Sequence, residues 1–155
     1  RRPPQPRRSP RPTLASAMAA ATLRVLAPLG VRIPSAEACE AASQGHYVAY
    51  VVVCTAADGR EWEVRRRYRA FRALREELRA HRTRHPLPGR RFLGRLRREH
   101  LEARQEQLQA FVVDLVGSVT QAAKAKGAIG DDLDDGCLAL LRFLLGEEGA
   151  AEAMA

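Results

Sequence analysis

Residues 62–74 read W-E-V-R-R-R-Y-R-A-F-R-A-L and join a strand pattern to a helix pattern. Up to Arg65, apolar and charged residues alternate with the period of two that is typical of a half-buried strand. Phe71, Leu74 and Leu78 then follow at steps of three and four, the spacing of an amphipathic helix. Arginine donors gathered where the first-turn N–H groups of a helix are unpaired suit a phosphate. The stretch therefore predicts an anion-binding junction, with a solvated basic surface as the alternative.

The positive charge of the chain is concentrated around this junction. The 155 residues carry a formal net charge of +8. Residues 60–104 hold 16 basic and 6 acidic side chains, a net of +10, whereas residues 105–155 hold 3 and 9, a net of −6. This distribution predicts an anionic partner, which is a phospholipid surface, a nucleic acid or an acidic protein.

No pattern points to catalysis, a metal or a cofactor. Walker, G-x-G-x-x-G and G-x-S-x-G patterns are absent, so we expect no enzyme. Cys39, Cys54 and Cys137 show no paired spacing, which argues against a disulfide framework and a cysteine metal site and favours a reducing compartment. His81 and His85 have the spacing of one helical turn, but Pro86 argues against a continuous helix across them, so no metal is expected there. No apolar run is long enough to span a membrane.

The pattern predicts one domain, residues 23–146, between two tails. Residues 1–22 are rich in Pro, Arg and Ala and are expected to be disordered, and they could be a docking or targeting segment. Met18 could be the initiator, and residues 147–155 are expected to be a flexible tail.

Three strands and three helices are expected in this domain, an α+β fold. Strands are predicted within residues 23–33, at residues 47–55 and around Trp62, with a loop over residues 34–45 and a hairpin turn at Asp58-Gly59. Together they form an antiparallel meander that needs helices on its apolar face. The helices are expected at residues 69–81, 98–119 and 138–145, with an extended connector at 86–89 and a stop at Gly146.

The second of these helices carries an arginine on its apolar stripe. Arg104 falls in line with Leu101, Leu108, Phe111 and Leu115, at steps of three and four. An unpaired guanidinium is costly in such a place. Arg104 must therefore either reach out at the margin of the core or meet a buried or ligand-supplied anion.

Three separate motifs then resemble those of one family. They are R-R-Y-x-x-F-x-x-L from Arg66, P-L-P-G-R from Pro86 and R-x-x-x-L-x-x-F from Arg104. In this order and spacing they resemble the phox homology (PX) domain, the phosphoinositide-binding module of sorting nexins and NADPH oxidase subunits. The resemblance covers roughly residues 31–146 and implies a three-stranded antiparallel sheet packed against a helical subdomain.

The resemblance also implies a pocket for phosphatidylinositol 3-phosphate. Arg67 matches the arginine that binds the 3-phosphate, Tyr68 the aromatic under the inositol ring, and Arg69 a position that assists with that phosphate. Arg90 matches a position that is usually lysine and contacts the 1-phosphate, where arginine keeps the charge but changes reach and geometry. Arg104 matches the arginine that hydrogen-bonds the 4- and 5-hydroxyls, so lipids phosphorylated there are expected to fit poorly.

Family members carry a loop beyond the proline turn that dips into the bilayer. Phe92 and Leu93 fall in the corresponding place, flanked by Arg91 and Arg95, and we expect these four residues to contact the membrane. Each arginine would add up to about 1 kcal/mol of attraction to anionic headgroups. The alternative is that Phe92 and Leu93 cover the core.

The expected function is reversible recruitment of a cytoplasmic protein to endosomal membranes, for sorting and trafficking, with trafficking proteins as further partners. One alternative is a PX-fold protein-interaction module with only nonspecific binding to anionic lipid. A second alternative is a basic nucleic-acid-binding protein, against which the absence of an aromatic stacking platform and of DNA-binding signatures counts.

Overall fold

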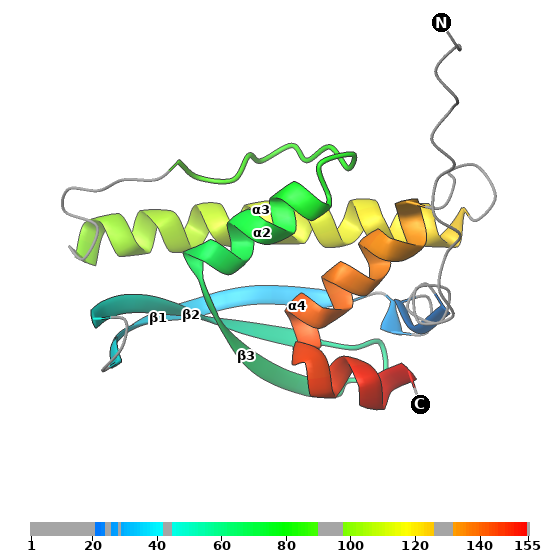
Figure 1. Ribbon diagram of the computed structural model, residues 1–155, viewed down its shortest axis with the longest axis horizontal. Coiled ribbons are helices and arrows are strands. Elements are labelled where there is room, and N and C mark those ends of the chain that lie inside the picture. Colours follow the sequence, from blue (N-terminus) through cyan, green and yellow to red (C-terminus); the bar gives the residue numbers. More distant parts are fainter. Residues whose placement is uncertain are drawn as a thin grey trace, which may run out of the picture.

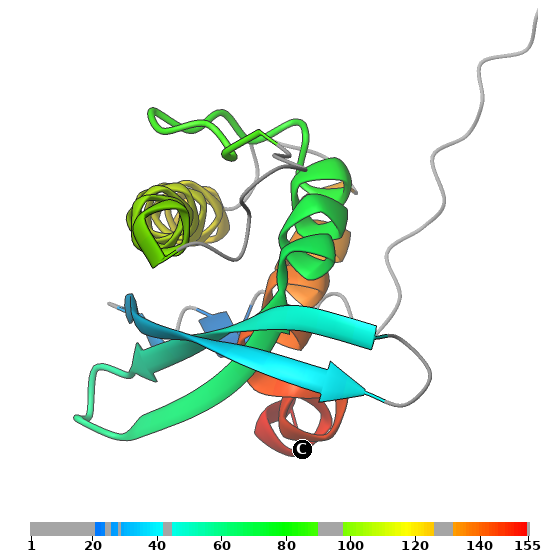
Figure 2. The ribbon, with the colours of Figure 1, turned by 90° about the vertical axis from the view of Figure 1, so that its left-hand side faces the viewer.

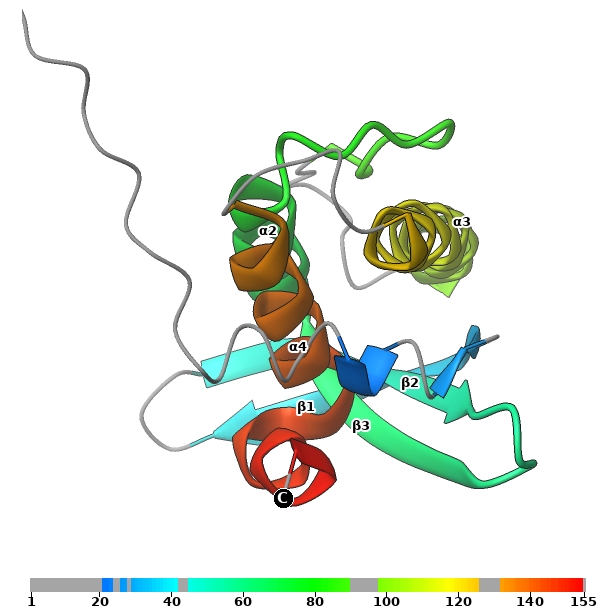
Figure 3. The same cartoon turned by 90° about the vertical axis from the view of Figure 1, so that its right-hand side faces the viewer.

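The computed structural model describes residues 21–23, 26–27, 29–41, 45–89, 98–125 and 132–154. Its three strands are β1 (Gly30–Ala41), β2 (Gly45–Thr55) and β3 (Glu61–Arg67), and they form an antiparallel sheet in the order β1-β2-β3. The helices are α2 (Tyr68–Glu77), α3 (Arg98–Lys124) and α4 (Asp132–Met154). Figure 1 shows α3 running lengthwise over the sheet, and Figures 2 and 3 show α2 and α3 side by side above the same face. The predicted α+β meander covered by helices is confirmed.

The first strand differs from its prediction. Residues 34–45 were expected to be a loop, but β1 continues to Ala41 and pairs with β2 from Ser35↔Val51 to Ala41↔Gly45. An edge strand needs only one partner and tolerates proline and polar residues, which is why its sequence does not read as a strand. Upstream of it, Leu23 and Leu26 are helical rather than extended, and both are buried.

A bulge in β1 anchors the long helix. The register shifts between Arg32 and Ser35, which takes Ile33 out of the ladder. The Ile33 N–H donates to Gln109 Oε1 at 2.8 Å, and Gln105 Nε2 donates to the Ile33 carbonyl at 2.9 Å. Because the two glutamines are one helical turn apart on α3, they satisfy both backbone groups that the bulge leaves unpaired. The position of α3 on the sheet is fixed by this pair of bonds.

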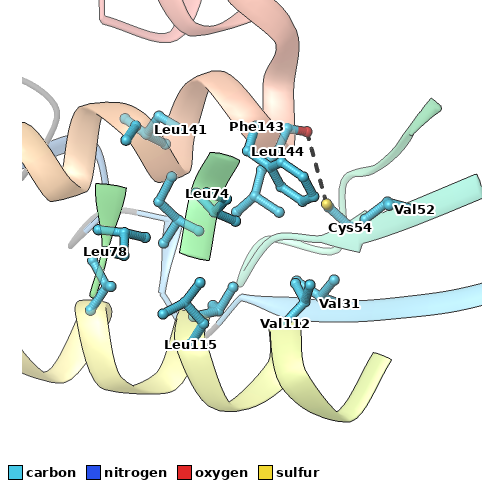
Figure 4. Close-up of a cluster of buried hydrophobic side chains, with 14 of the residues drawn as sticks. Val31, Val52, Cys54, Leu74, Leu78, Val112, Leu115, Leu141, Phe143 and Leu144 are labelled. Atoms are coloured by element: carbon cyan, nitrogen blue, oxygen red, sulfur yellow. Dashed lines mark hydrogen bonds between the residues drawn. The ribbon is translucent and has the colours of Figure 1, made fainter. Parts of the chain in front are cut away.

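The core lies between the sheet and the helices. Figure 4 shows leucines of α2 and α4 packed over Val112 and Leu115 of α3, with Val52 and Cys54 on the sheet side. The stripe predicted for α3 is confirmed at Leu108, Phe111 and Leu115, which are fully buried.

Three helix boundaries lie away from their predicted positions. α4 begins at Asp132 rather than at residue 138. α2 ends at Glu77, before the predicted end at residue 81. α3 was expected to end at residue 119 but runs to Lys124, through Gly117. The helix continues because Val119 and Ala123 extend the buried stripe, which offsets the roughly 1 kcal/mol that a glycine costs inside a helix.

The end of the apolar part of α4 is capped by side chains of β3. Gly146 has φ 76° and interrupts the helix, as its sequence position predicted, and the chain is helical again up to Met154. The break leaves the preceding carbonyls without intrahelical partners. Trp62 Nε1 donates to the Leu144 carbonyl at 2.9 Å, and Arg66 Nε donates to the Phe143 carbonyl at 2.8 Å.

Arg66 is therefore a structural residue rather than part of a solvated basic surface. It also donates to the Arg142 carbonyl at 3.2 Å, and its guanidinium carbon lies 5.7 Å from the centroid of the Phe143 ring. Burial lowers the pKa of Arg66, but a guanidinium remains protonated in proteins. A cation at the carbonyl end of a helix also interacts favourably with the helix dipole.

Replacement of Arg66 should destabilise the fold. Arg66→Ala removes charged hydrogen bonds to the end of α4, and we expect a loss of about 2 kcal/mol in the free energy of unfolding, measured by urea denaturation. Arg72→Ala is the control, because Arg72 is exposed on α2. Equal effects of the two substitutions would contradict the capping role.

Candidate functional site

The junction between β3 and α2 leaves a helix N-terminus open. Arg67 is the N-cap residue of α2, with extended backbone (φ −82°, ψ 159°) and no side-chain capping bond, and the first turn has no acidic residue. The first N–H groups of the helix and its dipole therefore favour an anion at this point. Arg69 is exposed on the same turn.

Tyr68 and Arg104 meet at the end of the proline connector. The guanidinium carbon of Arg104 lies 4.7 Å from the centroid of the Tyr68 ring, and Arg104 Nη2 donates to the Gly89 carbonyl at 3.2 Å. The Tyr68 hydroxyl donates to the carbonyl of Pro88, the residue before Gly89. These contacts bring together α2, α3 and the connector, which are far apart in the sequence.

Aromatic and carbonyl groups stabilise the Arg104 guanidinium at its position on the apolar stripe. Among the described residues no carboxylate forms an ion pair with Arg104, whose described partners are a ring face and a carbonyl. Tyr50 of β2 lies next to it from the core side, with 1% of its surface exposed. Burial raises the pKa of the Tyr50 phenol, and the charge of Arg104 and a hydrogen bond with it act in the opposite direction.

Arg67 lies against a different tyrosine. Its guanidinium carbon is 4.3 Å from the centroid of the Tyr47 ring, and both side chains are half-buried. In the sheet Arg67 pairs with Ala49, two residues from Tyr47 along β2. The site thus contains two arginines, each over a tyrosine ring.

The start of the connector is tied to α3. The backbone N–H of His85 donates to Asp114 Oδ2 at 2.8 Å, and His85 Nδ1 lies 2.7 Å from the same oxygen. Burial raises the pKa of the Asp114 carboxyl, but the hydrogen bonds and charge of His85 and the charge of Arg84 outweigh it, so the net shift is downward. The connector that carries Gly89 is therefore held at both of its ends.

A cavity of about 480 Å³ adjoins this connector. It lies between residues 85–89 and the face of α3 that carries Gln107. Arg104 borders it, but Arg67 and Tyr68 do not, so the cavity lies beside the arginine–tyrosine site rather than within it.

Metal and thiol chemistry find no support in the part of the chain that the structure describes. No group of three or more His, Cys, Asp or Glu side chains there could hold a metal ion. The three cysteines are free thiols, and burial raises the pKa of Cys54 to about 12. None of the described helices is long and apolar enough to cross a membrane.

The predicted site residues are only partly brought together. Tyr68 and Arg104 are in contact, while Arg67 neighbours Tyr68 in sequence and lies on Tyr47. Outside the described residues lie five predicted residues: Arg90, Arg91, Phe92, Leu93 and Arg95.

Two tyrosines of β2, Tyr47 and Tyr50, are not among the site residues predicted from the sequence. Tyr50 could have been noticed, because it alternates with Val52 and Cys54 on the core face and a buried hydroxyl needs a partner. The contact of Tyr47 depends on the register between β2 and β3, which the sequence does not specify.

Comparison with known proteins finds one family and one fold that match. The family model described as PX domain matches residues 55–124. The fold is similar to that described as the X-ray structure of a designed CISK-PX domain, with a TM-score of 0.54 and 22% identity over 74% of this chain and 97% of that chain. No curated protein matches the chain significantly.

The segment that the family model matches contains Arg67, Tyr68 and Arg104 of the site. It runs from the end of β2 through the junction at Arg67-Tyr68 to the end of α3, and so includes Arg104. A match to PX domains, which are lipid-binding modules, implies phosphoinositide binding and recruitment to membranes. The chain thus matches the PX domain over residues 55–124, and its three-stranded meander with helices has the fold of a solved PX domain.

Proposed function

We propose that this PX domain binds phosphatidylinositol 3-phosphate and recruits the cytoplasmic protein that carries it to endosomal membranes, in sorting and trafficking. The observation that supports the proposal best is the contact of Arg104 with Tyr68 and Gly89, beside Arg67 at the open N-terminus of α2. A ring face and two guanidinium groups at one junction are the donors and the surface that a phosphorylated inositol needs.

Each part of the headgroup has a proposed partner. Arg67 and the first N–H groups of α2 bind the 3-phosphate, assisted by Arg69, and Arg90 binds the 1-phosphate. The inositol ring stacks on Tyr68, where the Arg104 guanidinium now lies. Arg104 then moves toward the edge of the ring and donates to the 4- and 5-hydroxyls, so a phosphate at either position collides with it.

Charge and shallow insertion add to this specific contact. Residues 60–104 carry a net charge of +10, which attracts anionic lipid over a distance set by ionic strength. Arg91, Phe92, Leu93 and Arg95 are the proposed membrane contacts. Specific and nonspecific contributions combine to give binding that is selective, reversible and weakened by salt.

Loss of Arg67 should abolish selective binding. In liposome co-sedimentation at physiological salt, we expect the wild type to prefer vesicles with phosphatidylinositol 3-phosphate over vesicles with the 4,5-bisphosphate or with phosphatidylserine of matched charge. Arg67→Gln should weaken binding to the 3-phosphate vesicles by about tenfold or more, because it removes a charged phosphate contact. Arg72→Gln removes the same charge from an exposed site on α2 and should keep the preference.

Equal binding of the wild type to all three kinds of vesicle would contradict the proposal. The arginines would then act only as a basic surface. A parallel titration with soluble RNA of the same charge separates that result from nucleic-acid binding.

Arg104→Lys should reduce discrimination between headgroups. Lysine keeps the charge but loses the planar fork of donors and the stack on Tyr68. By calorimetry with a soluble short-chain phosphatidylinositol 3-phosphate, we expect about tenfold weaker binding and a smaller preference over the 3,4-bisphosphate. Arg79→Lys, at an exposed position of the turn after α2, is the matched control. Unchanged selectivity would remove Arg104 from the site.

A further inference from the structure

Three successive arginines of β3 have different partners. Arg65 is paired with two carboxylates, Glu37 at 3.0 Å and Glu63 at 3.3 Å. Arg66 donates to the carbonyl end of α4. Arg67 lies over the ring of Tyr47. The described contact of the Arg67 guanidinium is thus the face of an aromatic ring of the sheet.

The contact between Arg67 and Tyr47 is set by the sheet itself. Arg67 pairs with Ala49, and Tyr47 is two residues away, so both side chains stand on the same face as diagonal neighbours. Tyr47 is in turn paired with Cys39 of β1, which places its ring in the middle strand rather than on a free edge. β1 therefore flanks Tyr47 on one side, and Arg67, at the end of the β2–β3 pairing, lies on the other.

Stacking suits an arginine that must bind phosphate. The N–H donors of a guanidinium lie in its plane, so contact through its face restrains the group without using any donor. The Tyr47 ring can therefore restrain the orientation of the Arg67 guanidinium through its face.

We propose that Tyr47 is a positioning residue of the headgroup site, which acts by holding the Arg67 guanidinium in the orientation that binds the phosphate. This inference rests on the proposed function and adds a residue outside the three sequence motifs. Tyr47 restricts the rotamers of Arg67 before the lipid arrives, so binding loses less conformational entropy.

The test compares Tyr47→Phe with Tyr47→Leu. Phenylalanine keeps the aromatic face, whereas leucine keeps apolar bulk without it. By calorimetry with soluble short-chain phosphatidylinositol 3-phosphate, Tyr47→Phe should bind within about twofold of the wild type, and Tyr47→Leu about 3- to 30-fold more weakly. The Arg67 Nε–Hε signal in nuclear magnetic resonance should shift in Tyr47→Leu and stay near its wild-type position in Tyr47→Phe, because a ring current acts on it.

Other results would overturn the assignment. Wild-type affinity or tighter binding in Tyr47→Leu would show that the stack does not prepare Arg67, and equal weakening in both variants would assign the effect to the hydroxyl. A lower binding stoichiometry with unchanged affinity would mean that leucine only reduces the folded fraction. In these cases the proposed function stands if the wild type binds. Failure of the wild type to bind any 3-phosphorylated headgroup overturns the proposed function itself, and this inference with it.

Discussion

A guanidinium on the apolar stripe of α3 is the constraint on which the arrangement of the site depends. None of the described carboxylates forms an ion pair with Arg104. It is stabilised by the face of Tyr68, the carbonyl of Gly89 and the phenol of Tyr50. These three groups come from three parts of the chain and Arg104 from a fourth, so the contacts of one cation bring the connector, the sheet and two helices together. A cation held by dipoles and rings retains attraction for an anionic ligand.

Much of the fold could be predicted because its signals are periodic or local. The apolar stripe of α3, the hairpin at Asp58-Gly59 and the break at Gly146 each depend on residue spacing or backbone freedom. The prediction failed at β1 between residues 34 and 41, because an edge strand beside a bulge needs neither alternation nor β-branched residues. It also ended α3 too early, at residue 119, because burial of later residues outweighs the cost of the glycine at position 117.

The candidate site was less accessible to sequence reasoning. Arg104 stood out because a charge on an apolar stripe violates a local rule. Arg66 looked like its charged neighbours, since the carbonyls that it caps lie 76 and 77 residues further along the chain. Tyr47 carries no local signal, because its partnership with Arg67 arises from strand register. A residue that acts through tertiary contacts can be recognised only in the structure, whereas a residue that breaks a sequence pattern can be recognised from the sequence.

The bulge at Ile33 has a consequence for crowded conditions. An edge strand with unpaired N–H and carbonyl groups is a template for pairing with a second chain, and recruitment to a membrane raises local concentration. In β1 the glutamines of α3 occupy both backbone groups of Ile33, and Pro34 has no N–H to offer. The bonds that anchor the helix thus also interrupt the exposed edge, so that copies gathered on one surface are hindered from joining strand to strand.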